Sequence, residues 1–143
     1  MGPGLAAENV VLGPRRRVAH DIVPTGSSTD PEYWSVGLTE AEARDYYECA
    51  VAVVRRRAHR TKLSRRGFSK LIAERRRHYI LGARVLGEYS AEIIQAAAVA
   101  MAAIMRVEQL AELQLAYPTF TEALGTAAQK LVHQLGRWEG VLN

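Results

Sequence analysis

The segment GFSKLIAERRRHYILGARVLGE, residues 67–88, contains two apolar stretches separated by a short basic link. The stretches at 67–74 and 79–88 are rich in the aliphatic and aromatic side chains that strands favour. The link between them is too short for a parallel crossover, so we expect two antiparallel strands. A Val-rich stretch at 50–57 lies before them across another short basic link. The sequence therefore predicts an antiparallel meander of three strands.

The second half of the chain is predicted to be helical. Ser90 is a suitable N-cap for a helix over 91–105, in which only Glu92 and Gln95 are polar. A helix that is apolar nearly all the way round is buried on more than one side. One sheet face covers one side, so a second partner surface is implied. A short helix is expected next, over 107–115.

Two capping boxes mark further helices. In the first, Thr39 and Glu42 begin a short helix that ends near Tyr47. In the second, Thr119 and Glu122 begin a final helix that runs to about residue 135. The fold class is therefore α+β, an antiparallel β-sheet meander flanked by helices.

The length of 143 residues is that of one domain, and 48% hydrophobic and 24% charged residues are typical of a globular one. Residues 1–31 are rich in Pro, Gly and Ser, and we expect them to be irregular apart from a short helix at 5–12. We divide the chain into a connector at 1–28, a domain at 29–136 and a tail at 137–143.

Several kinds of site are not expected. A single cysteine, Cys49, excludes an internal disulfide and a Cys-cluster zinc site, and we interpret it as a small buried residue at a strand start. The four histidines lack ligand spacing and a carboxylate cluster, so no metal site is predicted. No strand, glycine turn and helix N-terminus combine into a phosphate cradle, so we expect no cofactor.

The chain is expected to be a cytoplasmic protein with reduced Cys49. Its longest apolar run, residues 96–105, is about half a bilayer span, and its N-terminus lacks the basic region of a secretory signal. The formal charge is +4, with 19 Lys and Arg against 15 Asp and Glu. Arg clusters such as 55–57 and 75–77 have no nucleic-acid motif beside them. We therefore expect a solvated basic rim and regard nucleic-acid binding as unlikely.

Three stretches, in order, resemble the C-terminal dimerisation domain of the pyridine nucleotide-disulfide oxidoreductases, the flavoenzymes typified by dihydrolipoamide dehydrogenase, glutathione reductase and mercuric reductase. The stretches are TDPE at 29–32 with SVGLTEAEA at 35–43, GFSKLI at 67–72 with ILGARVLG at 80–87, and AEIIQ at 91–95 with YPTFTE at 117–122. The resemblance covers about residues 20–135. Residues 4–12 also resemble the last helix of that family's FAD domain, so the chain resembles an enzyme that lacks its FAD and NAD domains.

The resemblance implies an antiparallel sheet with helices and a homodimer with two-fold symmetry. The family's domain also presents a His-Pro-x-x-x-Glu motif to the partner subunit, in which the His is the thiol acid/base and the Glu orients it. Here Tyr117 replaces the His, whereas Pro118 and Glu122 remain. A phenol with a pKa near ~10 does not readily take a proton near neutral pH, which argues against the thiol role at this position. Glu122 fits both a helix cap and a site residue.

Two functions follow as hypotheses. The first is a self-associating dimerisation module without the ancestral redox activity. The second is a repurposed, cofactor-free enzyme of a cyclase or isomerase type, with a hydrophobic small-molecule ligand in an apolar groove. An Arg-rich composition fits a bacterial genome, in which such enzymes serve natural-product biosynthesis. Its catalytic candidates are Tyr117 and Glu122, and its substrate-binding candidates are His20, Asp21, Tyr33 and Trp34.

The aromatic side chains have a simpler interpretation as well. We expect most of them to lie in the core and at interfaces. They are Tyr33, Trp34, Tyr46, Tyr47, Tyr79, Tyr89 and Trp138.

Overall fold

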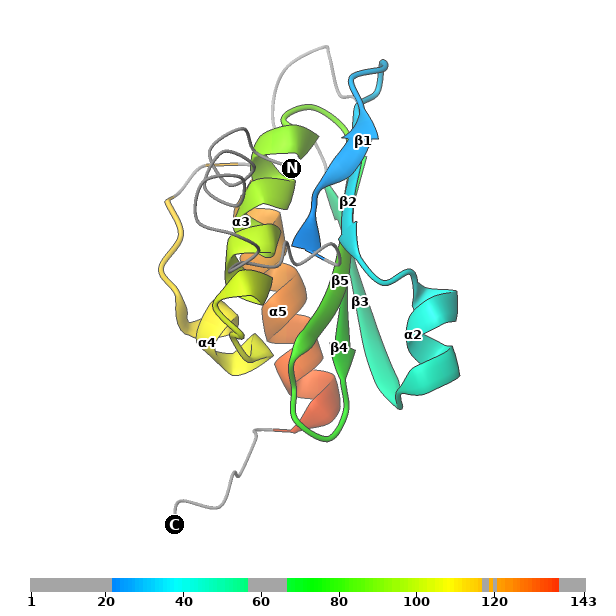
Figure 1. Ribbon diagram of the computed structural model, residues 1–143. Coiled ribbons are helices and arrows are strands. Elements are labelled where there is room, and N and C mark those ends of the chain that lie inside the picture. The colour runs from blue at the N-terminus through cyan, green and yellow to red at the C-terminus, as the bar shows by residue number, and fades with distance from the viewer. Residues whose placement is uncertain (1–21, 57–66, 117–118, 120, 137–143) are drawn as a thin grey trace, which may run out of the picture.

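The computed structural model describes residues 22–56, 67–116, 119 and 121–136 of the chain. These residues form one antiparallel sheet with strand order β1-β2-β5-β4-β3. Helices α3, α4 and α5 lie on one side of the sheet and α2 on the other (Figure 1). The elements are β1 (Thr25–Ser27), β2 (Tyr33–Gly37), α2 (Glu40–Tyr46), β3 (Cys49–Arg56), β4 (Gly67–Glu74), β5 (Ile80–Leu86), α3 (Ser90–Ala102), α4 (Val107–Glu112) and α5 (Glu122–Leu135).

The predicted meander is confirmed. Strands β3, β4 and β5 are antiparallel neighbours, and β4 has the predicted bounds. Strand β5 is shorter than predicted, because Tyr79 forms an isolated bridge with Arg106 just before the strand and Gly87 adopts a φ of 117° just after it. The α+β fold class is therefore correct.

Two strands lie where the sequence predicted irregular structure or no strand. Strand β1 pairs with β2, and β2 pairs with β5, so the sheet has five strands. The prolines that suggested an irregular segment lie beside these strands: Pro24 precedes β1 and Pro31 lies in the β1–β2 connection. A strand of three to five residues has too few positions for its alternation to stand out.

A pair of glycines lets the chain leave the sheet after β2. Gly37 has a φ of 69° and lies opposite Gly82 in β5. A Cβ on Gly82 would lie 2.2 Å from the backbone oxygen of Leu38, which no side chain tolerates. The chain then enters α2 through the predicted capping box, in which Thr39 Oγ1 accepts from the Glu42 amide at 3.2 Å and Glu42 Oε2 accepts from the Thr39 amide at 2.7 Å.

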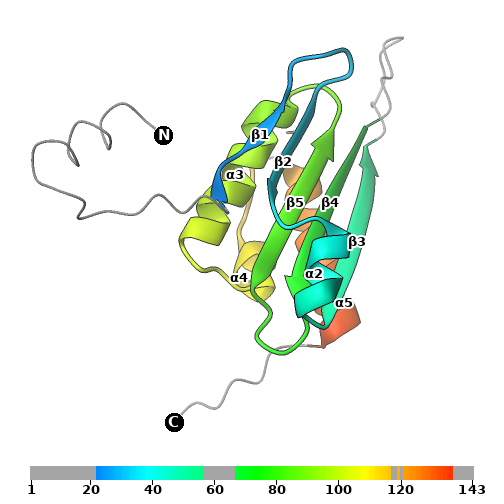
Figure 2. The same ribbon diagram turned by 45° about the vertical axis from the view of Figure 1, so that its right-hand side comes forward.

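The main core fills the space between the sheet and helices α3 and α5 (Figure 2). Its largest fully buried side chains are Leu71, Ile93, Ile94, Leu124 and Leu131, with Val36, Val85 and Val107. A second, smaller cluster lies under α2 and consists of Ala43, Cys49 and Ile72. Cys49 is buried, as predicted, and the two clusters hold the sheet from both sides.

Two predicted N-caps are wrong. Ser90 is the first residue of α3, and the N-cap is Tyr89 in the left-handed region, because the Ser90 hydroxyl donates to the Gly87 carbonyl instead. Glu122 is likewise the first residue of α5, with Thr121 as N-cap. The Thr119 hydroxyl donates to the Ala116 carbonyl at 2.6 Å, so it does not cap this helix.

Two helices are shorter than the sequence predicts. Helix α3 ends at Ala102, because Ile104 has a φ of 53° that no right-handed helix allows. Helix α4 ends at Glu112, before residue 113 turns to extended geometry.

In the described residues, no helix is long and apolar enough to cross a membrane.

Candidate functional site

The structure describes only part of the site that the sequence proposed. Tyr117, His20 and Asp21 lie outside the described residues, as do the helix at 5–12 and Trp138. Tyr33 and Trp34 are neighbours in β2 and therefore face opposite sides of the sheet. The structure thus does not bring these two rings into one cavity.

The surroundings of the described candidates differ. Trp34 packs against the main core, whereas Tyr33 is 38% exposed and pairs with Leu86. Glu122 is exposed at the start of α5. A substrate-binding or catalytic role for these three residues stays a prediction.

Of the aromatic residues that the sequence assigned to the core and interfaces, those at the end of α2 do not lie in the core, and their place at an interface stays a prediction. Tyr46 is 79% exposed and Tyr47 is 42% exposed, at the end of that short helix. Tyr89 is also about half exposed. Tyr79 is partly buried, with the Arg106 guanidinium 5.2 Å from its ring centroid, a cation–π distance.

The β5–α3 turn contains the strand, glycine and helix start that a phosphate cradle requires, a combination the sequence analysis did not find. Two of its donors are already used: the Gly87 amide donates to the Glu32 carbonyl at 2.8 Å, and the Ser90 hydroxyl donates to the Gly87 carbonyl. The carboxylate of Glu92 lies in the first turn of α3, where it opposes a bound phosphate. These residues therefore do not fit the phosphates of a nucleotide cofactor.

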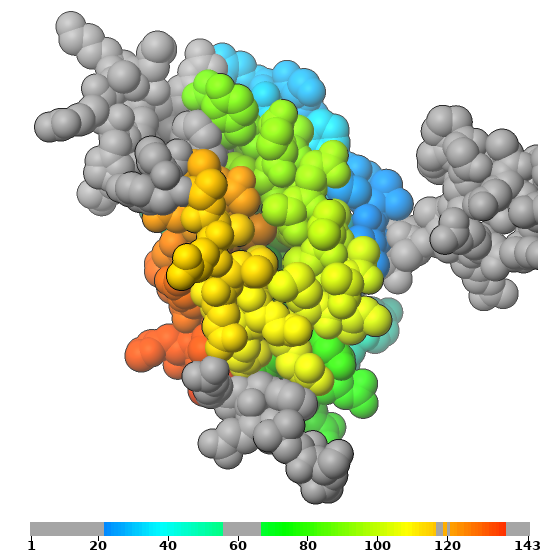
Figure 3. All heavy atoms as spheres, turned by 90° about the vertical axis from the view of Figure 1, so that its left-hand side faces the viewer, coloured from blue at the N-terminus to red at the C-terminus, as the bar shows by residue number. Residues whose placement is uncertain are grey.

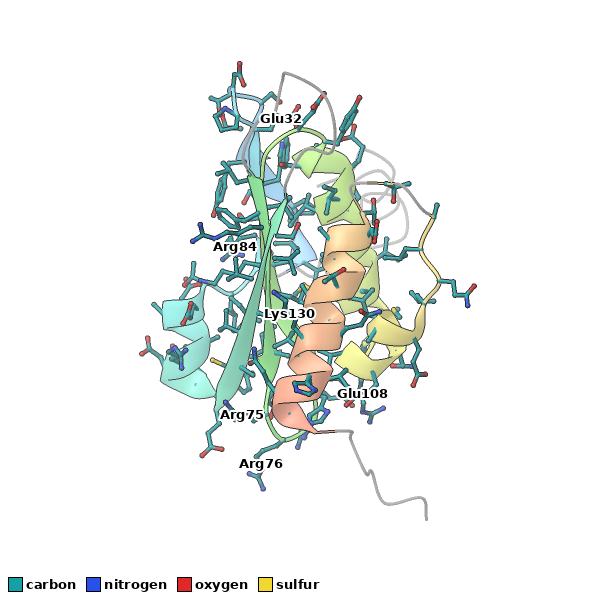
Figure 4. All side chains as sticks on the ribbon, turned by 180° about the vertical axis from the view of Figure 1, so that it is seen from behind. Glu32, Arg75, Arg76, Arg84, Glu108 and Lys130 are labelled. Carbon is teal, nitrogen blue, oxygen red and sulfur yellow. The ribbon has the colours of Figure 1, made fainter. Side chains whose placement is uncertain are left out.

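A buried polar pair joins the β4–β5 turn to α4, and the sequence analysis missed it. His78 is 4% exposed, and its Nδ1 contacts the Glu108 carboxylate, which Figure 4 shows beside the lower part of α5, on the α4 side. The Val107 amide also donates to the His78 carbonyl at 3.0 Å. Their separation of 30 residues in the chain left no local spacing that could have revealed the pair. Its role is to fix α4 against the turn.

Helix α2 is tied to the sheet by charged groups. Glu40 accepts from Lys70 Nζ at 2.5 Å and from Arg44 Nη2 at 2.7 Å. The Lys70 and then the Arg44 hydrogen bonds lower the pKa of Glu40. The Thr39 amide and hydroxyl lower the pKa of Glu42 in the same way, and Glu40 raises the pKa of Arg44. These groups hold the helix and its capping box in place.

The outer sheet face carries other basic side chains that serve the backbone. Arg84 Nη1 donates to the Val36 carbonyl at 2.9 Å and to the Ala83 carbonyl at 2.7 Å. Arg75 and Arg76 are exposed at the β4–β5 turn (Figure 4). This position agrees with the solvated basic rim that the sequence predicts.

The helical layer presents an apolar surface to solvent. Ile93, Ile94 and Ala97 on the inner side of α3 are buried against the sheet, but Val99 on the same helix is 66% exposed. Ile104, just after α3, is 67% exposed, and Leu113, just after α4, is 50% exposed. Helices α3 and α4 and the segment after α4 form one continuous face (Figure 3). We call Val99, Ile104 and Leu113 the helical-layer patch.

The described residues contain no group of three or more His, Cys, Asp or Glu side chains that could hold a metal ion.

Comparison with known families gives a match over most of the chain. The profile described as "Pyridine nucleotide-disulphide oxidoreductase, dimerisation domain" matches residues 23–128. The chain is 35% identical over 140 residues to a mercuric reductase of Streptomyces lividans, which covers 93% of this chain and 29% of that protein. It is 32% identical over 143 residues to a dihydrolipoyl dehydrogenase of Synechocystis, covering 92% of this chain and 29% of that protein.

Solved structures share the fold. The flavoprotein disulfide reductase RclA from Escherichia coli superposes with a TM-score of 0.75 at 25% identity, covering 87% of this chain and 30% of that one. LpdA from Mycobacterium tuberculosis gives a TM-score of 0.75 at 22% identity, covering 88% of this chain and 28% of that one. The chain therefore spans less than a third of the length of the relatives it matches.

Proposed function

Because the chain belongs to the dimerisation-domain family of the pyridine nucleotide-disulphide oxidoreductases, we propose that it is a self-associating module that forms a homodimer through its helical-layer patch. We do not assign to this chain the redox reactions of its full-length relatives. The printed sequence supplies one thiol, and a disulfide exchange within one chain needs two. Cys49 is also buried under α2, away from the helical layer, and a buried free thiol suits a reducing compartment such as the cytoplasm.

The observation that carries the proposal is the exposure of apolar side chains on α3 and after it. An isolated soluble surface rarely gathers large apolar side chains on one face without a partner. The sequence already implied a second surface over this helix. Within the described residues α3 packs against β2 and β5 on its inner side, and Val99 and Ile104 remain exposed.

The free energy gained by burying the helical-layer patch is comparable with the cost of association. Fully burying a Val, Leu or Ile side chain contributes about 1.5–3 kcal/mol, and the patch residues are half to two thirds exposed, so each contributes about 1–2 kcal/mol when covered. Three such residues on each of two copies give about 6–12 kcal/mol. This lies within the cost of about 4–15 kcal/mol for bringing two proteins together. Burial of the patch therefore offsets much of this cost, and further contacts around it are needed for net affinity.

The test is the oligomeric state of the full chain and of a Val99→Glu variant. Sedimentation equilibrium over a dilution series should give a dimer for the unchanged chain and a monomer for the variant, because a buried unpaired carboxylate costs several kcal/mol. Val53→Glu is the matched control, since Val53 is 44% exposed on β3, outside the helical layer. It should leave the dimer intact.

Two results would contradict the proposal. A monomer for the unchanged chain at micromolar concentration removes self-association altogether. Dissociation by Val53→Glu but not by Val99→Glu would keep self-association and move the interface to the sheet.

A further inference from the structure

Strand β3 forms one edge of the sheet, with β4 as its neighbour on the other side. The Arg75 amide donates to the Glu48 carbonyl at 2.8 Å, which identifies 48 and 75 as a hydrogen-bonded pair. In an antiparallel ladder such pairs alternate, so Ala50 and Ala52 bond to β4. The amides and carbonyls of Val51 and Val53 then point away from the sheet, toward the open edge.

Side chains of α5 reach these outward carbonyls. Lys130 Nζ donates to the Val53 carbonyl at 3.3 Å, and Gln134 Nε2 donates to the Val51 carbonyl at 3.2 Å. Figure 4 shows Lys130 where α5 lies beside the sheet. The spacing matches: four helix residues rise about 6 Å, and two strand residues rise about 6.7 Å. One helix turn thus covers two successive edge carbonyls.

We propose that Lys130 and Gln134 close the β3 edge to strand addition by a second copy of this chain. An open edge with unpaired amides and carbonyls is a template for another strand, and β3 has eight residues and a Val-rich sequence. The opposite edge needs less protection, because β1 has three residues and follows Pro24. The same strand in a second copy offers the same edge, so β3 pairing with β3 would join the two sheets.

Lys130 and Gln134 both occupy carbonyls that an incoming strand would need. Lys130 also adds a positive charge, which in a β3–β3 pair would lie close to the Lys130 of the second copy. Like charges brought together at a strand pair are destabilising. The closed edge therefore leaves the helical-layer patch as the surface for ordered pairing.

The test uses Lys130→Ala with Gln134→Ala in the full chain, made in the Val99→Glu background so that pairing through the patch does not contribute. Sedimentation velocity should show species larger than those of Val99→Glu alone, and the infrared amide I band of intermolecular strands should appear with them. The matched control is Gln129→Ala with His133→Ala, which changes two exposed α5 residues at the same spacing. The control should sediment as Val99→Glu does.

A third substitution identifies the edge itself. Val53→Pro removes an amide that points outward, so it leaves the β3–β4 ladder intact and blocks strand addition. Added to the double variant, it should abolish the larger species. Large species that persist with Val53→Pro, or a double variant that is folded by circular dichroism and sediments as its background, would overturn the proposal. If the double variant is unfolded, Lys130→Ala alone gives the same two outcomes.

The result of this edge test does not depend on whether the proposed dimer exists. A monomeric unchanged chain would remove the dimer through the patch, yet the double variant would still report on the edge.

Discussion

Three polar side chains are buried among the described residues: Ser69, His78 and Ser90. Ser90 donates its hydroxyl to the Gly87 carbonyl, and His78 contacts Glu108, so both have partners. Ser69 differs, since no described group lies within hydrogen-bond distance of its Oγ. Its side chain is fully buried in β4, opposite Val54 on one side and Val85 on the other. The three residues should therefore respond differently to substitution.

Ser69→Ala should stabilise the protein. A buried hydroxyl without a partner costs about 1–3 kcal/mol, and Ala removes the hydroxyl with little change in volume. We expect the free energy of unfolding in urea to rise by about 1 kcal/mol. Ser35→Ala is the control, because Ser35 Oγ donates to the Thr25 carbonyl at 3.2 Å, and its loss should lower the free energy or leave it unchanged. A lower free energy for Ser69→Ala would show that the hydroxyl has a partner.

Glu108→Ala should destabilise the protein by about 1–3 kcal/mol. The substitution leaves the buried His78 ring without its acceptor, and hydrogen bonds to charged groups fall in this range. Glu92→Ala is a matched control, because Glu92 also lies in the first turn of a helix but is exposed. Urea unfolding should separate the two, and equal losses would mean that the effect comes from the helix dipole alone.

At the scale of elements, the sequence was informative where a pattern is long or where two groups of one segment interact. The eight residues of β4 and the Thr39–Glu42 box gave correct bounds for β4 and for the start of α2. Local reasoning failed at Ser90 and Thr119, because each hydroxyl bonds to a carbonyl before the helix instead of capping it. Propensity alone does not decide between these two partners.

The site shows the same limit. The contacts of His78 with Glu108 and of Lys130 with β3 span 30 and 77 residues, so only the folded chain brings their atoms together. The prediction of a second surface over α3 rested on the apolar composition of that helix, which identified the helix that a partner would cover. Composition did not show that the exposed apolar side chains lie at its C-terminal end and after α4.

Helix α2 should loosen in acid. Hydrogen bonds hold the pKa of Glu40 and of Glu42 below the ordinary value of 4.5. A carboxyl with a lowered pKa binds fewer protons in the folded state, so its contribution to stability is complete above the unfolded pKa and is lost as pH falls through the folded one. We expect the free energy of unfolding to fall below about pH 4.5. Glu40→Gln with Glu42→Gln should flatten this dependence, and an unchanged acid slope would place its origin in other carboxylates.

For the whole molecule, the two sides of the sheet have different chemistry. The α2 side carries charged groups engaged with the protein itself, such as Lys70 with Glu40 and Arg84 with backbone carbonyls. The helical side carries exposed Val99 and Ile104. The β3 edge is occupied by Lys130 and Gln134. Within the described part of the chain, the helical side is therefore the face on which we expect pairing, and contact between this face on each of two copies is closed and two-fold rather than extended.

Pairing of this kind makes the thermal stability of the protein depend on the protein concentration. If the folded chain is a dimer that dissociates on unfolding, a tenfold rise in protein concentration adds about 1.4 kcal/mol per dimer. The unfolding entropy of two chains is about 0.6 kcal/mol per kelvin, from roughly 2.1 cal/mol/K per residue, so Tm should rise by about 2 °C for each tenfold step. Differential scanning calorimetry over a hundredfold range resolves this shift. Val99→Glu should remove the dependence while Val53→Glu keeps it, and a constant Tm for the unchanged chain would mean that folding does not depend on its partner.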